Sequence, residues 1–178
     1  MAKTVWELDK AHSYVGFSVR HMMVSNVRGV FNDFDATVHT EGEDLSTADI
    51  VVTINPNSID TRNSQRDEHL RSADFFKVNE YPEIVFRAHN LQHKGGEKHE
   101  LQGEITIVGV TKPLTLDVEI SGPAKNPWGN EVIGVVGSGS LNRSDFGLTY
   151  NAALETGGVL IGDTIKLNIE VEFVKKSE

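Results

Sequence analysis

Apolar and polar residues alternate along much of the chain. Between Asp163 and Lys175, every second residue from Ile165 to Phe173 is apolar, and the residues between them are polar or charged. A period of two is typical of a β-strand with one buried face. Four shorter stretches show the same alternation: Tyr14–Arg20, Ile50–Ile54, Ile84–Ala88 and Leu114–Ile120. Weaker patterns predict further strands at Thr4–Asp9, Val27–Thr40, Glu100–Val110 and Val132–Arg143.

The alternation in Val27–Thr40 changes face partway along. Val27, Gly29 and Phe31 have one parity, whereas Phe34, Ala36 and Val38 have the other. A strand changes face only where an extra residue interrupts the pleat. We therefore predict a bulge or bend at Asn32-Asp33.

Turn-forming residues separate the expected strands, and one segment is helical in character. The turn residues cluster at Lys94–Glu97, Val110–Pro113 and Pro123–Asn130, with a short turn expected at Ser144–Gly147. The helix is expected between Asn63 and Ser72. Its start, Ser64 to Asp67, resembles a capping box with Asp in place of Glu. Asp67 also precedes Arg71 by four residues, a spacing that favours an ion pair on a helix.

Many antiparallel strands with one short helix indicate an all-β sandwich or barrel. Glycines inside the strand patterns mark bends or close backbone approach and favour the barrel: Gly103, Gly109, Gly134, Gly137 and Gly139. The chain shows no repeat and no linker, so we expect residues 1–178 to form a single domain. Whether the barrel is hollow or filled by its own side chains is left open by the periodicity.

Composition and charge exclude several classes of protein. The chain has 178 residues, with 17 Lys and Arg against 26 Asp and Glu, so its net charge is −9 and nucleic acid is not expected as the main partner. No apolar run approaches the ~20 residues that span a bilayer. Glu7 and Asp9 interrupt the place where a signal peptide has its apolar stretch, so we expect a cytoplasmic protein. The absence of Cys excludes thiol catalysis and Cys-ligated zinc.

The candidate catalytic and metal-binding patterns are weak. The seven His residues include His12, His21 and His69 as one conceivable set and His89, His93 and His99 as another. The spacing of the first set fits no metal-site template. The second set brackets the turn at Lys94–Glu97, and imidazoles at a hairpin tip are expected to point to solvent. The glycine-rich stretch Gly134–Leu141 is not followed by the helix that a phosphate-binding loop needs. A nucleophile elbow is also missing. We therefore expect no metal, no cofactor and no enzymatic activity.

Several ordered motifs resemble those of the YceI-like family of lipocalin-like barrels. The motifs are His12-Ser13-x-Val15-x-Phe17-x-Val19-Arg20-His21, Val27-Arg28-Gly29-x-Phe31, Arg66-Asp67-x-His69-Leu70, Asp74-Phe75-Phe76, Tyr81-Pro82-x-Ile84-x-Phe86, Gly103-x-Ile105-Thr106-Ile107-x-Gly109-Val110-Thr111-Lys112 and Arg143-x-Asp145-Phe146-Gly147. The resemblance implies an antiparallel eight-stranded lipocalin-like barrel with one short helix. It also implies a hydrophobic lumen that binds a polyisoprenoid or an isoprenoid quinone, as a lipid carrier, buffer or storage protein without settled enzymatic activity. Many members carry a secretory leader, which this sequence does not show.

The apolar stripes then predict the lumen, and the helical segment predicts its lid. The expected lumen residues are Val15, Phe17, Val19, Phe31, Phe86, Leu116, Val118, Leu167 and Ile169. We expect Arg66–Phe76 to form a lid or plug, and the mouth to include Arg20, His21, Arg66, Asp67, His69, Leu70, Phe75, Phe76 and Arg143. Arg66 and Asp67 are adjacent, so they are expected to point apart towards different strands.

The ligand head group is expected to be neutral, as in a quinone, because a chain of net charge −9 does not steer a pyrophosphate. The opposing possibility is that Arg20, Arg28, Arg66 and Arg143 converge at one mouth, unless they pair with carboxylates such as Asp67 and Asp145. The alternative function is an enzyme acting on a small apolar molecule, with His21, His69 or Asp67 as acid and base. A homodimer is left open.

Overall fold

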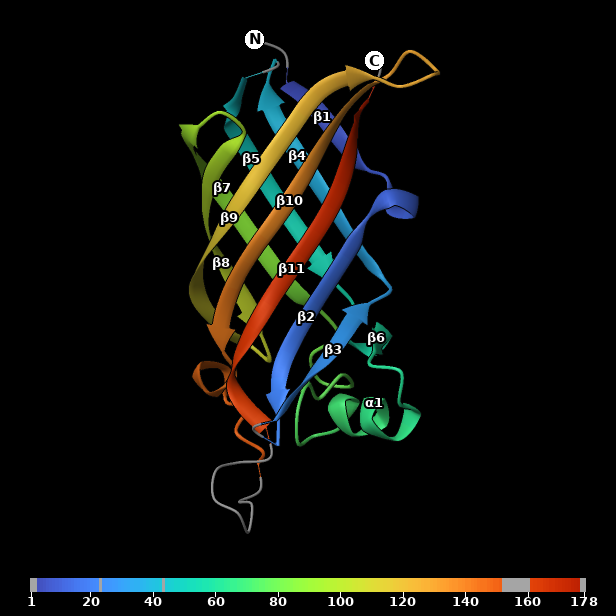
Figure 1. Cartoon of the computed structure of the whole chain (residues 1–178), viewed down its shortest axis with the longest axis vertical. Helices are drawn as coiled ribbons and strands as arrows, with labels where there is room; N and C mark the ends of the chain where they lie inside the picture. The colour runs from blue at the N-terminus through green and yellow to red at the C-terminus, as the bar shows by residue number, and fades with distance from the viewer. Residues whose placement is uncertain (1–2, 23, 43, 152–160, 177–178) are drawn as a thin grey trace.

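Antiparallel strands account for most of the computed structural model, which describes residues 3–22, 24–42, 44–151 and 161–176 (Figure 1). The strands are β1 (Lys3–Leu8), β2 (Tyr14–His21), β3 (Ser25–Phe31), β4 (Phe34–Glu41), β5 (Asp44–Ile54), β6 (Ile59–Asp60), β7 (Ile84–Gly95), β8 (Lys98–Ile107), β9 (Val110–Lys125), β10 (Glu131–Asn142) and β11 (Ile161–Lys175). The helices are α1 (Ser64–Arg71) and the 3-10 turns η1 (Lys10–His12), η2 (Pro56–Ser58) and η3 (Arg143–Phe146). The predicted strands and the predicted helix are therefore confirmed, although β5 begins six residues before its predicted start, β7 ends seven residues after its predicted end, and β6 was not predicted.

The sheet closes on itself. The pairing order β1-β4-β5-β7-β8-β9-β10-β11 returns to β1, and this ring is a closed eight-stranded antiparallel barrel. β1 and β2 share one edge of β11, because Trp6 is opposite Lys175 and Val15 is opposite Ile169. The two strands thus act as one long strand that η1 interrupts.

The predicted bend at Asn32-Asp33 is confirmed. β3 ends at Phe31 and pairs with β2 and β6, whereas β4 starts at Phe34 and pairs with β1 and β5. Among the described strands, β6 pairs only with β3, so strand pairing does not continue from β6 to β7 at this end of the barrel. The helix α1 lies at the same end, beside β3 and β6 (Figure 1).

Two of the predicted turns are displaced along the chain. Val110–Pro113 is part of β9 and not a turn, and the reversal occurs at Val108 and Gly109, whose φ angles are 50° and 75°. Two successive positive φ angles are typical of a type I′ hairpin turn, which matches the twist of the flanking strands. β9 also continues to Lys125, so the turn predicted from Pro123 begins only at Asn126.

The helix has a different cap from the one expected. Asn63, and not Ser64, is the N-cap, and its side chain accepts a hydrogen bond from the Arg66 backbone N–H at 3.0 Å. The predicted capping box was therefore wrong. The expected pair of Asp67 with Arg71 is also replaced, because Asp67 binds Thr61 and Arg71 donates to the carbonyl of Asn57 at 3.0 Å. Both side chains thus tie the helix to the chain before it.

Buried apolar residues fill the barrel at the end near the chain termini. Trp6 is fully buried there, and its indole N–H donates to Thr40 Oγ1 at 3.2 Å. The side chains packed with it are Ala36, Val38, Ala48, Ile133 and Phe173. The side-chain packing therefore blocks this end, and any open interior lies towards α1.

Candidate ligand-binding site

The barrel encloses a cavity of about 590 Å³ that extends from the Trp6 cluster to α1. All eight strands of the ring except β1 contribute side chains to its wall, together with β2, β3, β6 and α1. The alternation of each strand explains this wall, because successive side chains point to opposite faces of a sheet. The question that periodicity left open is thus answered: the barrel is filled at one end and hollow over the rest.

Each expected lumen residue lies in the cavity wall, although contact with a ligand stays a prediction. Two glycines on the inner face make room for large neighbours. A Cβ on Gly29 would lie 2.5 Å from the Phe17 ring, and a Cβ on Gly139 would lie 2.7 Å from Leu116 Cδ2. Such distances are far below van der Waals contact, so Phe17 and Leu116 keep their places only because these positions are glycine.

The polar part of the described wall gathers at the α1 end. It consists of Arg20, His21, Thr61, Asn63, Gln65, Arg66, His69, Arg143 and Tyr150. The rest of the wall is almost entirely apolar, as expected for a site that takes a long hydrocarbon and reads one polar end. The cavity mouth is therefore the end beside α1.

The segment Arg66–Phe76 contacts the barrel through two aromatic groups. Inside, the Phe76 ring packs edge-on against Phe31 with centroids 6.0 Å apart. At the mouth, His69 lies 4.7 Å from the ring centroid of Tyr150 and 5.1 Å from that of Phe75. The segment is placed across the mouth as a lid would be, and its opening remains a prediction.

Thr61 is hydrogen-bonded to two polar side chains of α1, those of Asp67 and Arg66. Its backbone N–H and its hydroxyl both donate to Asp67 Oδ1, at 2.9 and 2.5 Å. Arg66 donates to the same hydroxyl at 2.7 Å and to the Thr61 carbonyl at 2.6 Å. The expectation that Arg66 and Asp67 serve different strands was therefore wrong. Asp67 is buried and does not belong to the cavity wall.

Arg143 binds backbone carbonyls. Its guanidinium donates to Leu148 at 2.6 Å, to Tyr150 and Gly162 at 2.9 Å, and to Ile161 at 3.4 Å. Burial lowers the pKa of Arg143, an effect that the nearby Asp163 partly offsets. The arginine thus clamps the backbone on both sides of the β10–β11 connection.

The arginines that were considered for the mouth do not all lie in the cavity wall. Arg20 and Arg66 lie in the cavity wall with Arg143, whereas Arg28 does not. The reason is parity, because Val27 and Gly29 face the interior side of β3 and Arg28 therefore faces outwards. The four arginines do not all converge on one point.

The three candidate acid–base residues have separate surroundings. Asp67 is engaged by Thr61, while His21 and His69 line the mouth. His69 Nε2 is hydrogen-bonded to Asp74 Oδ2 at 2.8 Å. This pair fixes the orientation of the His69 ring between its aromatic neighbours.

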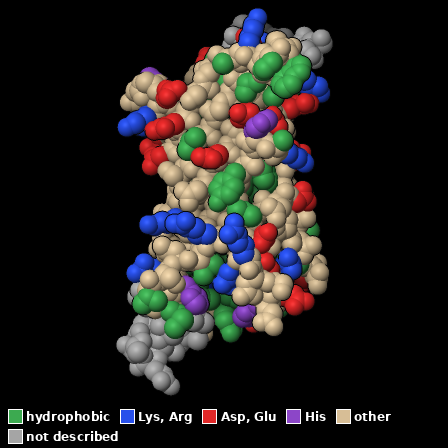
Figure 2. Space-filling view, turned by 45° about the vertical axis from the view of Figure 1, so that its right-hand side comes forward, with side chains coloured by type: hydrophobic (Ala, Val, Ile, Leu, Met, Phe, Trp, Pro, Cys, Tyr) green, Lys and Arg blue, Asp and Glu red, His purple; other side chains and the backbone are tan. Residues whose placement is uncertain are grey.

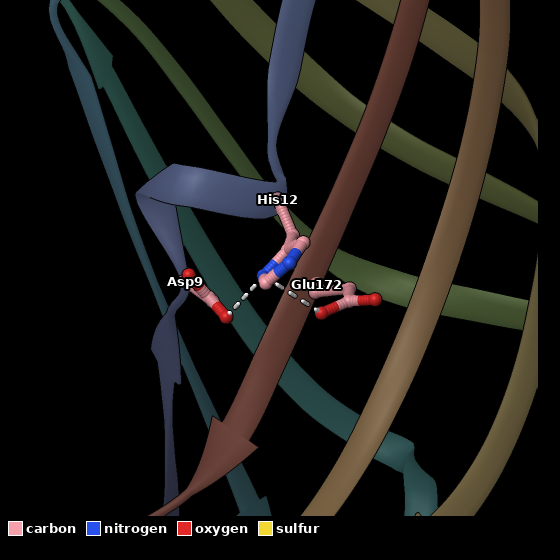
Figure 3. Close-up of side chains that lie close together, drawn as sticks. All are labelled: Asp9, His12 and Glu172. Atoms are coloured by element: carbon pink, nitrogen blue, oxygen red, sulfur yellow. Dashed lines mark hydrogen bonds and ion pairs between the residues drawn. The ribbon is translucent and has the colours of Figure 1, made fainter. Parts of the chain in front are cut away.

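Outside the cavity, Asp9, His12 and Glu172 form the group of described residues whose ligand atoms lie close enough for a metal ion, within 4.8 Å of one another (Figure 3). His12 Nδ1 is 2.8 Å from Asp9 Oδ2 and 3.7 Å from Glu172 Oε2. The hydrogen bond to Asp9 raises the pKa of His12, and the same bond lowers the pKa of Asp9.

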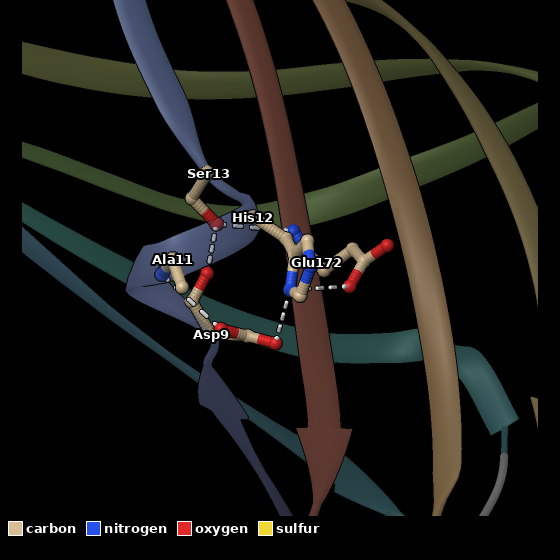
Figure 4. A network of polar contacts seen from close by, with 5 residues as sticks. All are labelled: Asp9, Ala11, His12, Ser13 and Glu172. Atoms are coloured by element: carbon tan, nitrogen blue, oxygen red, sulfur yellow. Dashed lines mark hydrogen bonds and ion pairs between the residues drawn. The ribbon is translucent and has the colours of Figure 1, made fainter. Parts of the chain in front are cut away.

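Backbone and hydroxyl contacts make this group a latch between η1 and β11. Ser13 Oγ donates to the Asp9 carbonyl at 2.6 Å and accepts from the Glu172 N–H at 3.2 Å (Figure 4). The Asp9 carboxylate also accepts from the Ala11 N–H at 3.2 Å. Ser13 is thus bound to the backbone and not to the His12 ring, which rules out a Ser–His–Asp triad at this place.

Two histidines of the second set, His93 and His99, lie at a hairpin tip, as the turn at Lys94–Glu97 predicts, whereas His89 lies farther back on β7. His93 on β7 is opposite His99 on β8, and their rings are 5.0 Å apart. Each ring has one nitrogen hydrogen-bonded to a backbone carbonyl, that of Gly96 or Glu97. The carbonyl bonds account for the orientation of both rings.

Sequence reasoning missed several residues of the mouth: Thr61, Asn63, Gln65, Leu148, Tyr150 and Ile161. Thr61 and Tyr150 lie outside regular strands and outside any periodic pattern, so no local signal marks them. Ile161 is the first residue of β11 and continues its parity with Ile165 and Leu167. Extending that alternation by four residues could have found it.

An eight-stranded antiparallel barrel with a hollow apolar interior and one polar mouth defines a lipocalin-like barrel. Within this class the chain belongs to the YceI-like family, because the YceI-like domain matches residues 6–173. The resemblance seen in the motifs is thereby confirmed. Among the residues that the structure describes, none of the helices is long and apolar enough to cross a bilayer.

Known relatives agree with this assignment. The UPF0312 protein SA2479 of Staphylococcus aureus (strain N315) is 42% identical over 171 residues, which are 96% of this chain and 97% of the relative. The crystal structure of the Campylobacter jejuni YCEI protein is similar with a TM-score of 0.75 and 39% identity, over 96% of both chains. A polyisoprenoid binding domain from Saccharophagus degradans has the same fold, with a TM-score of 0.72 and 13% identity over 96% of this chain and 98% of that domain.

Proposed function

We propose that this protein binds a long isoprenoid lipid, either a polyisoprenoid or an isoprenoid quinone, inside its barrel and acts as a carrier, buffer or store for it. The observation that carries the proposal is the cavity of about 590 Å³, apolar along its length and polar at its mouth. Small-molecule sites typically have volumes of about 300–1,000 Å³. The polyisoprenoid-binding name of the S. degradans domain, which shares the fold, supports the choice of ligand class.

Hydrophobic burial supplies enough free energy for this function. One five-carbon unit contributes up to ~4 kcal/mol, since each buried CH₂ contributes ~0.8 kcal/mol. Binding costs roughly 4–15 kcal/mol in lost motion and ordering. About four buried units contribute up to ~16 kcal/mol and therefore leave roughly 1–12 kcal/mol after this cost, a range that includes the roughly 8 kcal/mol of a Kd of about 1 μM.

The contacts at the mouth favour a neutral head group. Arg143 donates to four backbone carbonyls, and Arg66 donates twice to Thr61. These bonds use much of the donor capacity that a pyrophosphate would need. Asn63 and Gln65 are exposed at the same mouth and carry amide groups that suit the carbonyl oxygens of a quinone.

We also propose that binding involves no chemical step. Asp67 is held by Thr61, and His69 is held by Asp74 and two aromatic rings. Groups that are held by structural hydrogen bonds and packing are poorly placed to transfer protons. A hydrocarbon tail also has no acidic proton for them to remove.

The first test is to identify the lipid that leaves the freshly purified protein on organic extraction, with native mass spectrometry of the intact complex. Purified protein should then take up a prenyl quinone. Gly137 lies in the cavity wall on β10, has no positive φ, and a Cβ there would meet Val118 and Ile169 at 3.4 and 3.7 Å, so replacing Gly137 by Phe places a ring in the lumen without backbone strain. We expect this variant to lose uptake while its unfolding transition stays cooperative.

The matched pair for this experiment lies on β11. Ile169→Glu puts a charge on the inner face, whereas Asn168→Glu puts the same charge on the outer face one residue away. Loss of uptake in the first and normal uptake in the second are expected. Equal uptake by both folded variants would overturn the proposal. Much tighter, strongly salt-dependent binding of a prenyl pyrophosphate of equal chain length would overturn the neutral head group.

A further inference from the structure

The turn between β2 and β3 carries exposed apolar side chains where turns usually carry polar ones. The side chain of Met22 is 46% exposed and that of Val24 is 78% exposed. Met22 also has a φ angle of 53°, a conformation that favours Gly, Asn or Asp. Apolar residues gathered at such an exposed tip offer a contact surface to an apolar partner.

This tip stands at the mouth of the cavity. Arg20 and His21, which directly precede it, line the mouth, and His21 is opposite Ile161 of β11, which also lines it. In Figure 1 the lower ends of β2 and β3 lie beside α1 and point away from the chain termini. A surface that receives the tip would therefore face the entrance of the lumen.

The strands behind the tip carry positive charge although the protein as a whole is acidic. Between Asp9 and Asp33 the sequence has no carboxylate, while the net charge of the chain is −9. Arg20 and Arg28 belong to this stretch, and Lys166 of β11 lies in the same row, because it is opposite Ser18, which is opposite Arg28. All three residues are exposed, Arg28 and Lys166 away from the cavity and Arg20 at the rim of its mouth.

One face of the molecule also carries cations above an apolar region. In Figure 2 Lys and Arg side chains lie just below the middle of the view, with Asp and Glu side chains to their right, and hydrophobic and His side chains lie below them. The neighbouring carboxylate of β11, Asp163, accepts hydrogen bonds from the Ser144 N–H and hydroxyl at 3.0 and 2.9 Å. An apolar tip with cations a few residues behind it combines the two contributions that hold a protein at a membrane interface, which are buried apolar area and attraction to anionic lipids.

We infer that the β2–β3 tip docks the barrel mouth on an anionic phospholipid bilayer. Met22 and Val24 enter the boundary between head groups and acyl chains, and Arg20, Arg28 and Lys166 lie among the phosphates. Docking holds the lumen against the bilayer, so that an apolar ligand passes between the two without crossing water. The inference goes beyond the proposed function, because the surface binds lipid head groups whichever ligand the lumen holds.

Binding to vesicles tests the docking surface. The whole protein is sedimented with vesicles of phosphatidylcholine alone or mixed with phosphatidylglycerol, at low and at high salt. We expect binding only to the anionic vesicles and its loss at high salt. Removing the charges of Arg28 and Lys166 by substitution with Gln should weaken binding roughly fivefold per charge.

The apolar tip has its own variants and a matched control. The double variant Met22→Asn, Val24→Ser keeps a turn-compatible residue at the positive φ and should weaken vesicle binding by about tenfold or more. The control is Trp128→Ser. Trp128 is 82% exposed but lies in the β9–β10 connection at the opposite end of the barrel. The Trp128→Ser variant should therefore bind vesicles as the unsubstituted protein does. Equal binding to neutral and anionic vesicles, or an effect of Trp128→Ser as large as that of the tip variant, would overturn the inference.

Loading from detergent micelles separates this inference from the proposed function. Uptake of a prenyl quinone from micelles should be the same with and without the tip substitutions, whereas uptake from anionic vesicles should be slower with them. A protein that binds anionic vesicles but takes up no prenyl quinone would contradict the proposed function and support docking. A protein that takes up the quinone but binds no anionic vesicle would contradict docking.

Discussion

The ring of Phe76 meets the ring of Phe31 edge-on inside the barrel, with centroids 6.0 Å apart. This contact connects the segment after α1 to the wall of the lumen, and Phe31 in turn packs on Phe17 at 5.5 Å. A helix of eight residues is marginal in isolation, so its position depends on such contacts. The lid and the lumen wall are thereby packed as one unit.

Phe76→Ala should loosen the lid more than the barrel. Phe76 is half-buried, so we expect a loss of about 2 kcal/mol, less than for a fully buried Phe. Hydrogen exchange of residues 64–76 should become faster while that of β8 and β9 stays slow. In the unsubstituted protein, bound lipid should slow exchange in the same segment. The control is Glu68→Ala, which changes an exposed residue of α1. If the exchange rate of residues 64–76 changed neither in Phe76→Ala nor on lipid binding, a gating role would be contradicted.

Thr61→Val keeps the shape of the side chain and removes its hydroxyl. Asp67 then loses the shorter of its two hydrogen bonds, and Arg66 loses one acceptor. Because Asp67 is buried, we expect a loss of about 1–3 kcal/mol in urea unfolding. Thr61→Ser, which retains the hydroxyl, should recover most of it. A neutral result for Thr61→Val would mean that Thr61 does not hold the start of the lid.

Arg143→Met should destabilise the protein by about 3 kcal/mol, because carbonyls bound by a buried guanidinium lose their donor. The planar fork of arginine reaches several acceptors at once, so Arg143→Lys should recover only part of the loss. Urea unfolding gives the magnitude, and hydrogen exchange of residues 148–151 should show where the structure loosens. Reduced binding of a prenyl pyrophosphate without any change in stability would instead assign Arg143 to the ligand.

The latch of Asp9 and His12 should make stability depend on pH. The pKa of His12 is raised above its ordinary value of 6.5. Its contribution to the free energy of unfolding is therefore complete below pH 6.5 and is lost as the pH rises through the raised pKa. The pKa of Asp9 is lowered below 3.8, so its contribution is present above pH 3.8 and is lost as the pH falls through the lowered value. The latch is therefore strongest between about pH 4 and 6.5.

His12→Asn tests this window. Urea unfolding of both proteins across the pH range should show a stability difference between about pH 4 and 6.5 that shrinks in alkali and in strong acid. The control is the double variant His12→Asn, Asp9→Asn. Its free energy of unfolding should show no pH dependence from these two groups between about pH 4 and 6.5. A difference that is constant from pH 4 to 9 would show that the His12 charge does not contribute.

Regular strands were the part of the fold that alternation could predict, since burying one face of a sheet constrains every second residue. The bend at Asn32-Asp33 was predictable for the same reason, because it reverses the parity. The turn at Val108-Gly109 was not, since a β-branched residue at a positive φ contradicts its own preference and Pro113 nearby offers a stronger turn signal. The polar contacts of Thr61 and Arg143 were also hidden, because they depend on backbone carbonyls and hydroxyls that no periodicity marks.

The cluster around Trp6 gives the lumen a floor. A prenyl tail that enters at α1 can descend only until its last unit meets these buried side chains. In a series of ligands of increasing length, affinity should rise with each added unit and then level off, since further units remain outside. The length at which it levels off measures the depth of the barrel, and enlarging the floor by Phe173→Ala should move that point to a longer chain.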